Sequence, residues 1–75
     1  MNIKNLRDQI DIIDDEIINL LEKRFELIKQ IAPYKEHLTD EKRENKILKK
    51  INNPFIQDIY RSIFKNSKHL MSLKK

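Results

Sequence analysis

The sequence predicts an all-α protein that forms a single domain over residues 1–75, with a long first helix and two shorter ones. Apolar residues recur at alternating intervals of three and four through residues 3–34, which is the heptad spacing of a helix that packs along one side. No segment shows the apolar–polar alternation of a β-strand, and the chain contains no glycine for a phosphate-binding loop. Because 75 residues without cysteine bury only a modest core, we expect two copies to pack together.

The apolar seam of the first predicted helix has a cation at one of its positions. The seam consists of Ile3, Leu6, Ile10, Ile13, Ile17, Leu20, Leu27, Ile31 and Tyr34. The repeat requires one more apolar residue, and the sequence has Arg24 there. A guanidinium is expensive to desolvate, so this side chain needs an anion opposite it. A carboxylate of the protein can serve, and a seam arginine can also set oligomer register. We favour a small dicarboxylate ligand.

The ends of the first helix are marked by asparagine and proline. Asn2 or Asn5 can cap its N-terminus. Pro33 lacks a backbone N–H and crowds the preceding turn, so the helix either kinks there and continues to about residue 36 or ends near Ala32. We favour the kink, because Tyr34 keeps the apolar register.

Two shorter helices are predicted in the rest of the chain. Thr39 or Asp40 caps the first of them, which runs to about residue 51. The turn over residues 52–54 places Pro54 at the first position of the next helix. The apolar stripe of that helix consists of Phe55, Ile56, Ile59, Tyr60, Ile63, Phe64, Leu70 and Met71. Ser67 lies within the stripe, where its hydroxyl can also bond back to the carbonyl of Ile63.

The charge of the chain favours anionic partners, since its formal net charge is +4. Lysine-rich segments at residues 42–50 and 65–75 raise the alternative of a nucleic-acid binder, but aromatic residues are not interleaved with these cations and no binding motif is present. The histidines, His37 and His69, are isolated, so we expect no metal site. No apolar run is long enough for a membrane, and we expect a cytoplasmic protein that binds neither membrane nor nucleic acid.

Two further cations flank the seam of the first helix. Arg7 and Lys35 occupy the heptad column beside the one that contains Arg24. On a straight helix Lys35 is roughly 16 Å from Arg24, so two long side chains can hold one small ligand between them. Arg7 is roughly 25 Å away in the other direction and can join only from an antiparallel partner chain. Each of the two is also compatible with a solvated surface cation.

Over nearly the whole chain, these residues resemble the small all-helical chorismate mutases. The matching residues are Leu6, Arg7, Ile10, Asp11, Ile13, Asp14, Leu20, Leu21, Arg24, Lys35, Asp40, Arg43, Glu44 and Ser67. The resemblance implies two chains of three helices, intertwined through their first helices as a homodimer. It also implies the rearrangement of chorismate to prephenate on the route to phenylalanine and tyrosine, without cofactor or metal.

Roles for individual residues follow from the resemblance. Arg24 and Ser67, with the partner subunit's Arg7, would bind the two carboxylates of chorismate, because a guanidinium grips a carboxylate through two parallel hydrogen bonds. Lys35 would contact a carboxylate and the ether oxygen. Arg24, Lys35 and Glu44 are the predicted catalytic residues.

The resemblance also defines the opposite side of the site, where the sequence departs from the family pattern. Glu44, with backbone near Asp40 and Arg43, would receive the ring hydroxyl. The family usually has glutamine or a protonated glutamate four residues after Ser67 to bond the ether oxygen, and this chain has Met71. A thioether donates no hydrogen bond, and loss of such a donor costs roughly 10²–10³-fold in rate.

Two alternative functions therefore stay open at this point. One is an isochorismate-pyruvate lyase, which uses a similar cationic pocket for a closely related dicarboxylate. The other is a weakly active or non-catalytic helical module that regulates an enzyme of the same pathway, for which Met71 is the strongest sign.

Overall fold

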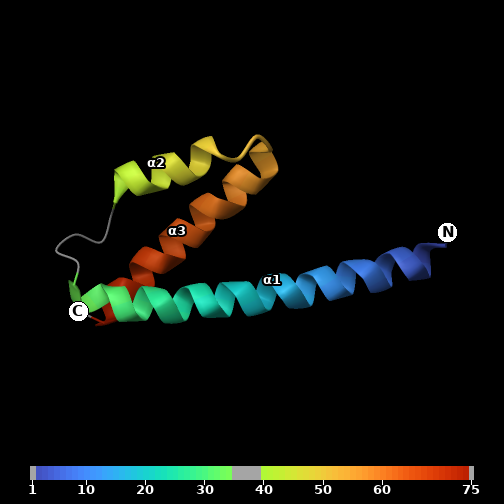
Figure 1. Cartoon of the computed structure of the whole chain (residues 1–75), viewed down its shortest axis with the longest axis horizontal. Coiled ribbons are helices and arrows are strands. Elements are labelled where there is room, and N and C mark those ends of the chain that lie inside the picture. The colour runs from blue at the N-terminus through green and yellow to red at the C-terminus, as the bar shows by residue number, and fades with distance from the viewer. Residues whose placement is uncertain (1, 35–39, 75) are drawn as a thin grey trace.

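The chain folds into three α-helices, as a computed structural model that describes residues 2–34 and 40–74 shows (Figure 1). Helix α1 spans Ile3–Ile31, α2 spans Glu41–Lys49 and α3 spans Pro54–Lys74. A 3-10 turn, Ala32–Tyr34, follows α1, and the described residues contain no β-strand. The predicted all-α class, with a long first helix and two shorter ones, is therefore confirmed.

Helix α1 begins and ends where its sequence weakens helical hydrogen bonding. The side chain of Asn2 accepts a hydrogen bond from the backbone N–H of Asn5 at 2.9 Å, so Asn2 is the cap. The α-helix ends at Ile31 and tightens into the 3-10 turn. Our preference for a kinked α-helix continuing past Pro33 is wrong, and the alternative end near Ala32 is correct. Proline supplies no N–H for the next helical bond, and a tighter turn accommodates this loss.

The two shorter helices start at polar caps. The carboxylate of Asp40 accepts a hydrogen bond from the backbone N–H of Arg43 at 3.1 Å at the start of α2. Asn53 accepts one from the backbone N–H of Phe55 at 2.8 Å, with Pro54 in the first turn of α3 as predicted. Helix α2 is shorter at its end than the sequence suggested, because it stops at Lys49.

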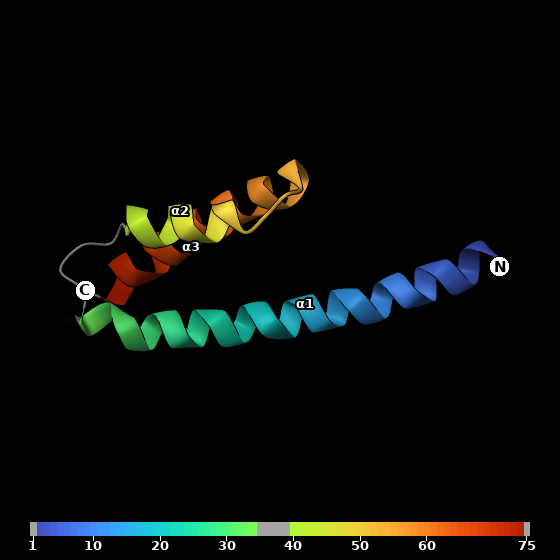
Figure 2. The ribbon, with the colours of Figure 1, turned by 45° about the horizontal axis from the view of Figure 1, so that its top comes forward.

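The three helices form an open arrangement in which α3 contacts both others (Figures 1 and 2). The C-terminal end of α3 lies beside the C-terminal end of α1, whereas the N-terminal half of α1 projects away from α2 and α3. The radius of gyration is 15.4 Å, against about 11 Å for a compact chain of this length. The accessible surface is 6579 Å², against about 4,900 Å² for a compact monomer of this mass. One chain thus leaves much of its surface uncovered.

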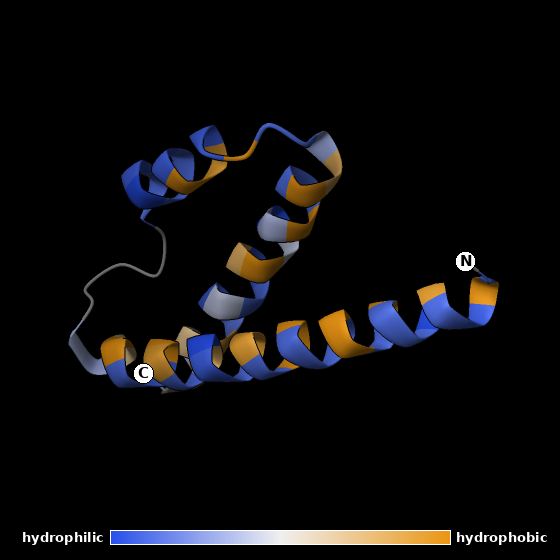
Figure 3. Cartoon of the chain, turned by 45° about the vertical axis from the view of Figure 1, so that its right-hand side comes forward, coloured by the Kyte–Doolittle hydropathy of each residue, from blue (hydrophilic) through white to orange (hydrophobic). Residues whose placement is uncertain are grey.

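The uncovered surface includes the heptad seam of α1. The buried residues of the described chain are Ala32, Phe64, Ser67 and Met71, and α1 itself contributes none. The exposed seam residues Ile3, Leu6, Ile10, Ile13, Ile17, Leu20, Leu27 and Ile31 keep 40% to 64% of their surface in solvent. Figure 3 shows apolar bands recurring along one side of α1, including its projecting half. In the part of the chain that the structure describes, no helix is long and apolar enough to cross a membrane.

A glutamine side chain fastens the end of α2 to α3. The last carbonyl groups of an α-helix have no partner within the helix. The side-chain nitrogen of Gln57, on α3, donates hydrogen bonds to the carbonyl oxygen of Leu48 at 3.3 Å and to that of Ile51 at 2.7 Å. Both N–H donors of one amide are thereby used, and they hold the turn between the two helices closed.

We therefore expect Gln57→Ala to destabilise the fold. The substitution removes two partly buried hydrogen bonds, so the free energy of unfolding should fall by about 1–2 kcal/mol, and backbone amides of α2 should exchange faster. Urea unfolding followed by circular dichroism and amide hydrogen exchange measure these effects. Gln30→Ala, at an exposed position of α1, is the matched control. An equal loss in both variants would show that the Gln57 contacts contribute nothing.

Candidate functional site

Charged side chains from all three helices meet in a pocket beside the C-terminal half of α1. Its lining residues are Arg24, Ile28, Asp40, Arg43, Glu44, Ile47, Phe64, Ser67, Lys68 and Met71. The cavity is small, about 40 Å³, which is room for about one water molecule. Three cationic and two anionic side chains in so small a space mark the strongest concentration of polar chemistry at a junction of the described helices.

The guanidinium of Arg24 is held at the wall of this pocket by α3. Its Nη1 donates a hydrogen bond of 2.6 Å to Oγ of Ser67, and this hydroxyl donates in turn to the carbonyl of Ile63 at 2.8 Å. The guanidinium carbon lies 6.0 Å from the centroid of the Phe64 ring, at the limit of a cation–π contact. The back-bond from Ser67 to Ile63 thus exists and leaves the serine oxygen free to accept from arginine.

The positive charge of Arg24 is partly withdrawn from water. Partial burial lowers the pKa of the Arg24 guanidinium from its ordinary value, Tyr60 raises it, and the positive charge of Arg43 lowers it further. Among the described residues, no carboxylate forms an ion pair with Arg24. The cost of withdrawing this charge from water is therefore only partly offset by the neutral Ser67 hydroxyl.

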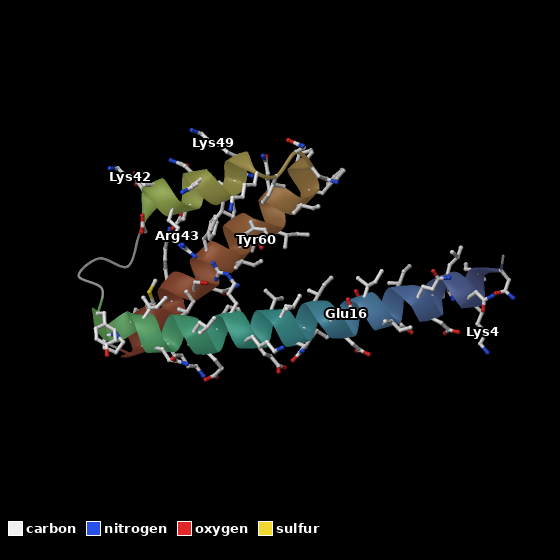
Figure 4. The ribbon with its side chains drawn as sticks, in the orientation of Figure 1. Lys4, Glu16, Lys42, Arg43, Lys49 and Tyr60 are labelled. Carbon is white, nitrogen blue, oxygen red and sulfur yellow. The ribbon has the colours of Figure 1, made fainter. Side chains whose placement is uncertain are left out.

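A second hollow adjoins the pocket on the other side of the arginines. It has a volume of about 380 Å³ and is lined by Arg24, Arg43, Ile47, Lys50, Ile51 and Tyr60. Arg24, Arg43 and Ile47 line both spaces, so the two guanidinium groups stand between them. Figure 4 shows Arg43 on the side of α2 that faces α3, whereas Lys42 and Lys49 point away. The second hollow alone lies within the roughly 300–1,000 Å³ of small-molecule sites.

An ion pair that the sequence did not predict lies in the lining of the pocket. The ammonium group of Lys68, on α3, lies 3.2 Å from Oε2 and 3.3 Å from Oε1 of Glu44, on α2. Lys68 directly follows Ser67, but consecutive residues of an α-helix do not face the same way, so the sequence did not place Lys68 in the site. Nor did it give the partner of Lys68, because the pairing depends on how α2 lies across α3.

The structure brings most of the predicted site residues together. Those that line the pocket are Arg24, Asp40, Arg43, Glu44, Ser67 and Met71, and the Met71 side chain is buried with 4% of its surface exposed. Arg7 does not line it, since it lies on the projecting half of α1, roughly 25 Å along the axis from Arg24. Lys35 lies outside the described residues.

A larger hollow elsewhere on the molecule does not gather such chemistry. It has a volume of about 740 Å³ and is lined by Asn19, Glu22, Lys23, Phe25, Glu26, Leu27 and Lys29. All of these residues belong to α1, so no second element converges on it, and Lys29 and Glu26 there already pair with each other at 3.0 Å. The smaller pocket is the better candidate because residues distant in the sequence meet there.

The fold and the pocket define an all-helical protein with a cationic site suited to a small organic anion. The chain matches the family described as chorismate mutase type II over residues 6–72, and it belongs to that family. The resemblance noted in the sequence is thereby confirmed, and it supports chorismate mutase activity, an isomerase reaction. No curated protein and no solved structure matches the chain significantly.

Because Arg24 replaces an apolar residue in the seam, we expect Arg24→Met to stabilise the fold. The substitution removes a partly desolvated charge and leaves Ser67 bonded to Ile63, so the free energy of unfolding should rise by about 1 kcal/mol. Urea unfolding measures it, with Lys23→Met, an exposed neighbour on α1, as control. A loss of stability would instead show that the contacts of Arg24 with Ser67 and Phe64 hold the fold together.

Proposed function

We propose that the protein is a chorismate mutase, a homodimer with two equivalent sites that converts chorismate to prephenate in phenylalanine and tyrosine biosynthesis. The observation that carries the proposal is Arg24: a partly buried guanidinium with a neutral partner among the described residues, beside a second guanidinium, in a chain of this family. A dicarboxylate substrate supplies the missing negative charge.

The proposed binding geometry combines the lining of the pocket with the roles that the resemblance implies. One carboxylate can accept from the guanidinium of Arg24, and from Ser67 when its hydroxyl turns from the carbonyl of Ile63 to the ligand. Glu44, which lines the pocket with Asp40 and Arg43, accepts a hydrogen bond from the ring hydroxyl of the substrate, a role that rests on the resemblance. Lys35 contacts a carboxylate and the ether oxygen; this role rests on the resemblance.

The proposed chemistry needs no group transfer. The ether C–O bond of chorismate breaks while a C–C bond forms in one concerted step, so neither a proton nor an electron has to be moved by the enzyme. The protein contributes by holding the compact conformer of the substrate. Fixed cations also stabilise the negative charge that grows on the ether oxygen, and such stabilisation is worth several kcal/mol in a site shielded from water.

The proposed dimer is supported by what one chain leaves exposed. The seam of α1 is covered by no described part of its own chain, and covering each half-exposed Ile or Leu contributes roughly 1 kcal/mol. Two antiparallel α1 helices would bury both seams. They would also bring the partner subunit's Arg7 beside Arg24. Within one helix the two residues lie roughly 25 Å apart.

Met71 favours a second candidate, a ligand-binding module without turnover that regulates an enzyme of the same pathway. Its buried thioether stands in the pocket beside Ser67 and Lys68 and donates no hydrogen bond to a bound ether oxygen. Binding of chorismate without product formation would support this candidate over the enzyme.

The proposed function is tested by turnover and by mixing two variants. Purified wild-type protein should convert chorismate to prephenate, and Arg7→Met and Arg24→Met homodimers should each be inactive. After unfolding and refolding of an equal mixture, half of the dimers carry both variants. Each of these has one intact site, so about a quarter of the wild-type activity should return.

Several results would contradict the proposal. A well-folded wild-type dimer without turnover would exclude the enzyme, and production of salicylate from isochorismate would indicate a lyase. Activity in Arg24→Met alone would exclude its catalytic role. If mixed dimers form, as differently tagged chains can show, and no activity returns, the site is not shared between subunits.

A further prediction concerns the missing donor. If Met71 faces the ether oxygen, Met71→Gln should raise kcat about tenfold or more, because the amide supplies a hydrogen bond where negative charge develops. Steady-state kinetics with chorismate measure the change. Met71→Leu, which conserves volume and also lacks a donor, should leave kcat unchanged. An unchanged or lower kcat in the glutamine variant would point to another donor.

A further inference from the structure

Lys68 forms an ion pair with Glu44 to which the proposed function assigns no role. Its ammonium nitrogen is nearly equidistant from the two carboxylate oxygens of Glu44, at 3.2 Å and 3.3 Å, and therefore lies across both of them. The pair is partly withdrawn from water, since 32% of the Lys68 side chain and 22% of the Glu44 side chain are exposed. An ammonium in this position limits the rotation of the carboxylate about its last bond.

The pair of Lys68 and Glu44 lines two neighbouring spaces. Glu44, Phe64 and Lys68 line the inner pocket that contains Arg24, and they also line an outer hollow of about 450 Å³. The outer hollow is completed by Leu48, Arg61 and Lys65. The ion pair of Glu44 with Lys68 therefore joins α2 to α3 where the two spaces meet.

The charge of Glu44 makes this contact significant. A free carboxylate beside a dianionic ligand repels it, and the repulsion is screened less in a partly buried site than in bulk water. The N-terminal end of α2, where Glu44 lies in the first turn, offsets part of the charge. Lys68 offsets more of it, and each carboxylate oxygen keeps a further lone pair for a hydroxyl group.

We propose that Lys68 is a positioning residue, which fixes the Glu44 carboxylate and offsets its charge so that it accepts the ring hydroxyl of a dianionic substrate. This inference rests on the proposed function. It assigns Lys68 to substrate recognition, because the ring hydroxyl is not the reacting centre and its contact is equally strong before and during the reaction. Loss of such a contact raises KM and leaves kcat nearly unchanged.

The test is a double-mutant cycle in the full-length dimer with chorismate as substrate. Lys68→Met should raise KM about tenfold with kcat within about threefold of wild type, and Lys68→Arg should restore most of the affinity. In a Glu44→Gln background, Lys68→Met should change KM by less than about twofold, because the charge to be offset is gone. Lys65→Met, at an exposed position on the same helix, should match wild type.

Each outcome decides the inference. An equal rise of KM in both backgrounds would overturn it, because Lys68 would then act on the ligand or the fold directly; so would no rise in either. If Lys68→Met does not fold, as circular dichroism shows, Lys68→Gln completes the same cycle. If the wild type lacks turnover, the cycle is read from the Kd of chorismate by calorimetry. A wild type that neither binds nor converts chorismate refutes the proposed function itself and the inference with it, whereas an active wild type with additive variants refutes the inference alone.

Discussion

The hydrogen bond between Arg24 and Ser67 joins the long first helix to the last one and is the contact around which the pocket is built. It places a cation where the heptad repeat calls for an apolar side chain, and so it fixes which part of α3 faces α1. The Ser67 hydroxyl completes its own bonding through Ile63, so the serine accepts from arginine without leaving a donor unsatisfied. The partner of the Arg24 guanidinium in this contact is a neutral hydroxyl, and the proposed dicarboxylate ligand would supply the opposite charge.

Helix α1 has two faces with different duties as a result. Its C-terminal half contacts α3 and the pocket, whereas the exposed seam and the projecting half have no cover in the chain described. A protein of this size gains little by exposing a row of isoleucines, and the excess of accessible surface over a compact monomer has the same origin. Arg7 is on the projecting half. The proposed antiparallel dimer would therefore cover the seam and also complete the site with the partner subunit's Arg7.

The sequence predicted local features better than contacts between helices. The caps at Asn2 and Asp40 and the start of α3 at Pro54 follow from short-range chemistry, and the structure reproduces them. The resemblance to a known family singled out residues that lie together in the pocket. Their roles remain predictions. Whether the helix kinks at Pro33 or tightens into a 3-10 turn depends on the local backbone energy, which the spacing of apolar residues does not reveal. The contacts of Gln57 and Lys68 were invisible, because they depend on how α2 lies on α3.

The position of helix α2 in the pocket depends on its contacts with α3. A helix of nine residues is not stable alone, so its position is set by its contacts with α3: the Gln57 amide at one end and the pair of Lys68 with Glu44 near the other. The inner cavity has a volume of about 40 Å³ in one chain, which is smaller than small-molecule sites usually are. Glu44 and Arg43 travel with α2, whereas Arg24 and Ser67 are bonded across α1 and α3. The side of the pocket formed by Arg24 and Ser67 is therefore held by the two long helices, whereas the side formed by Glu44 and Arg43 depends on the position of α2.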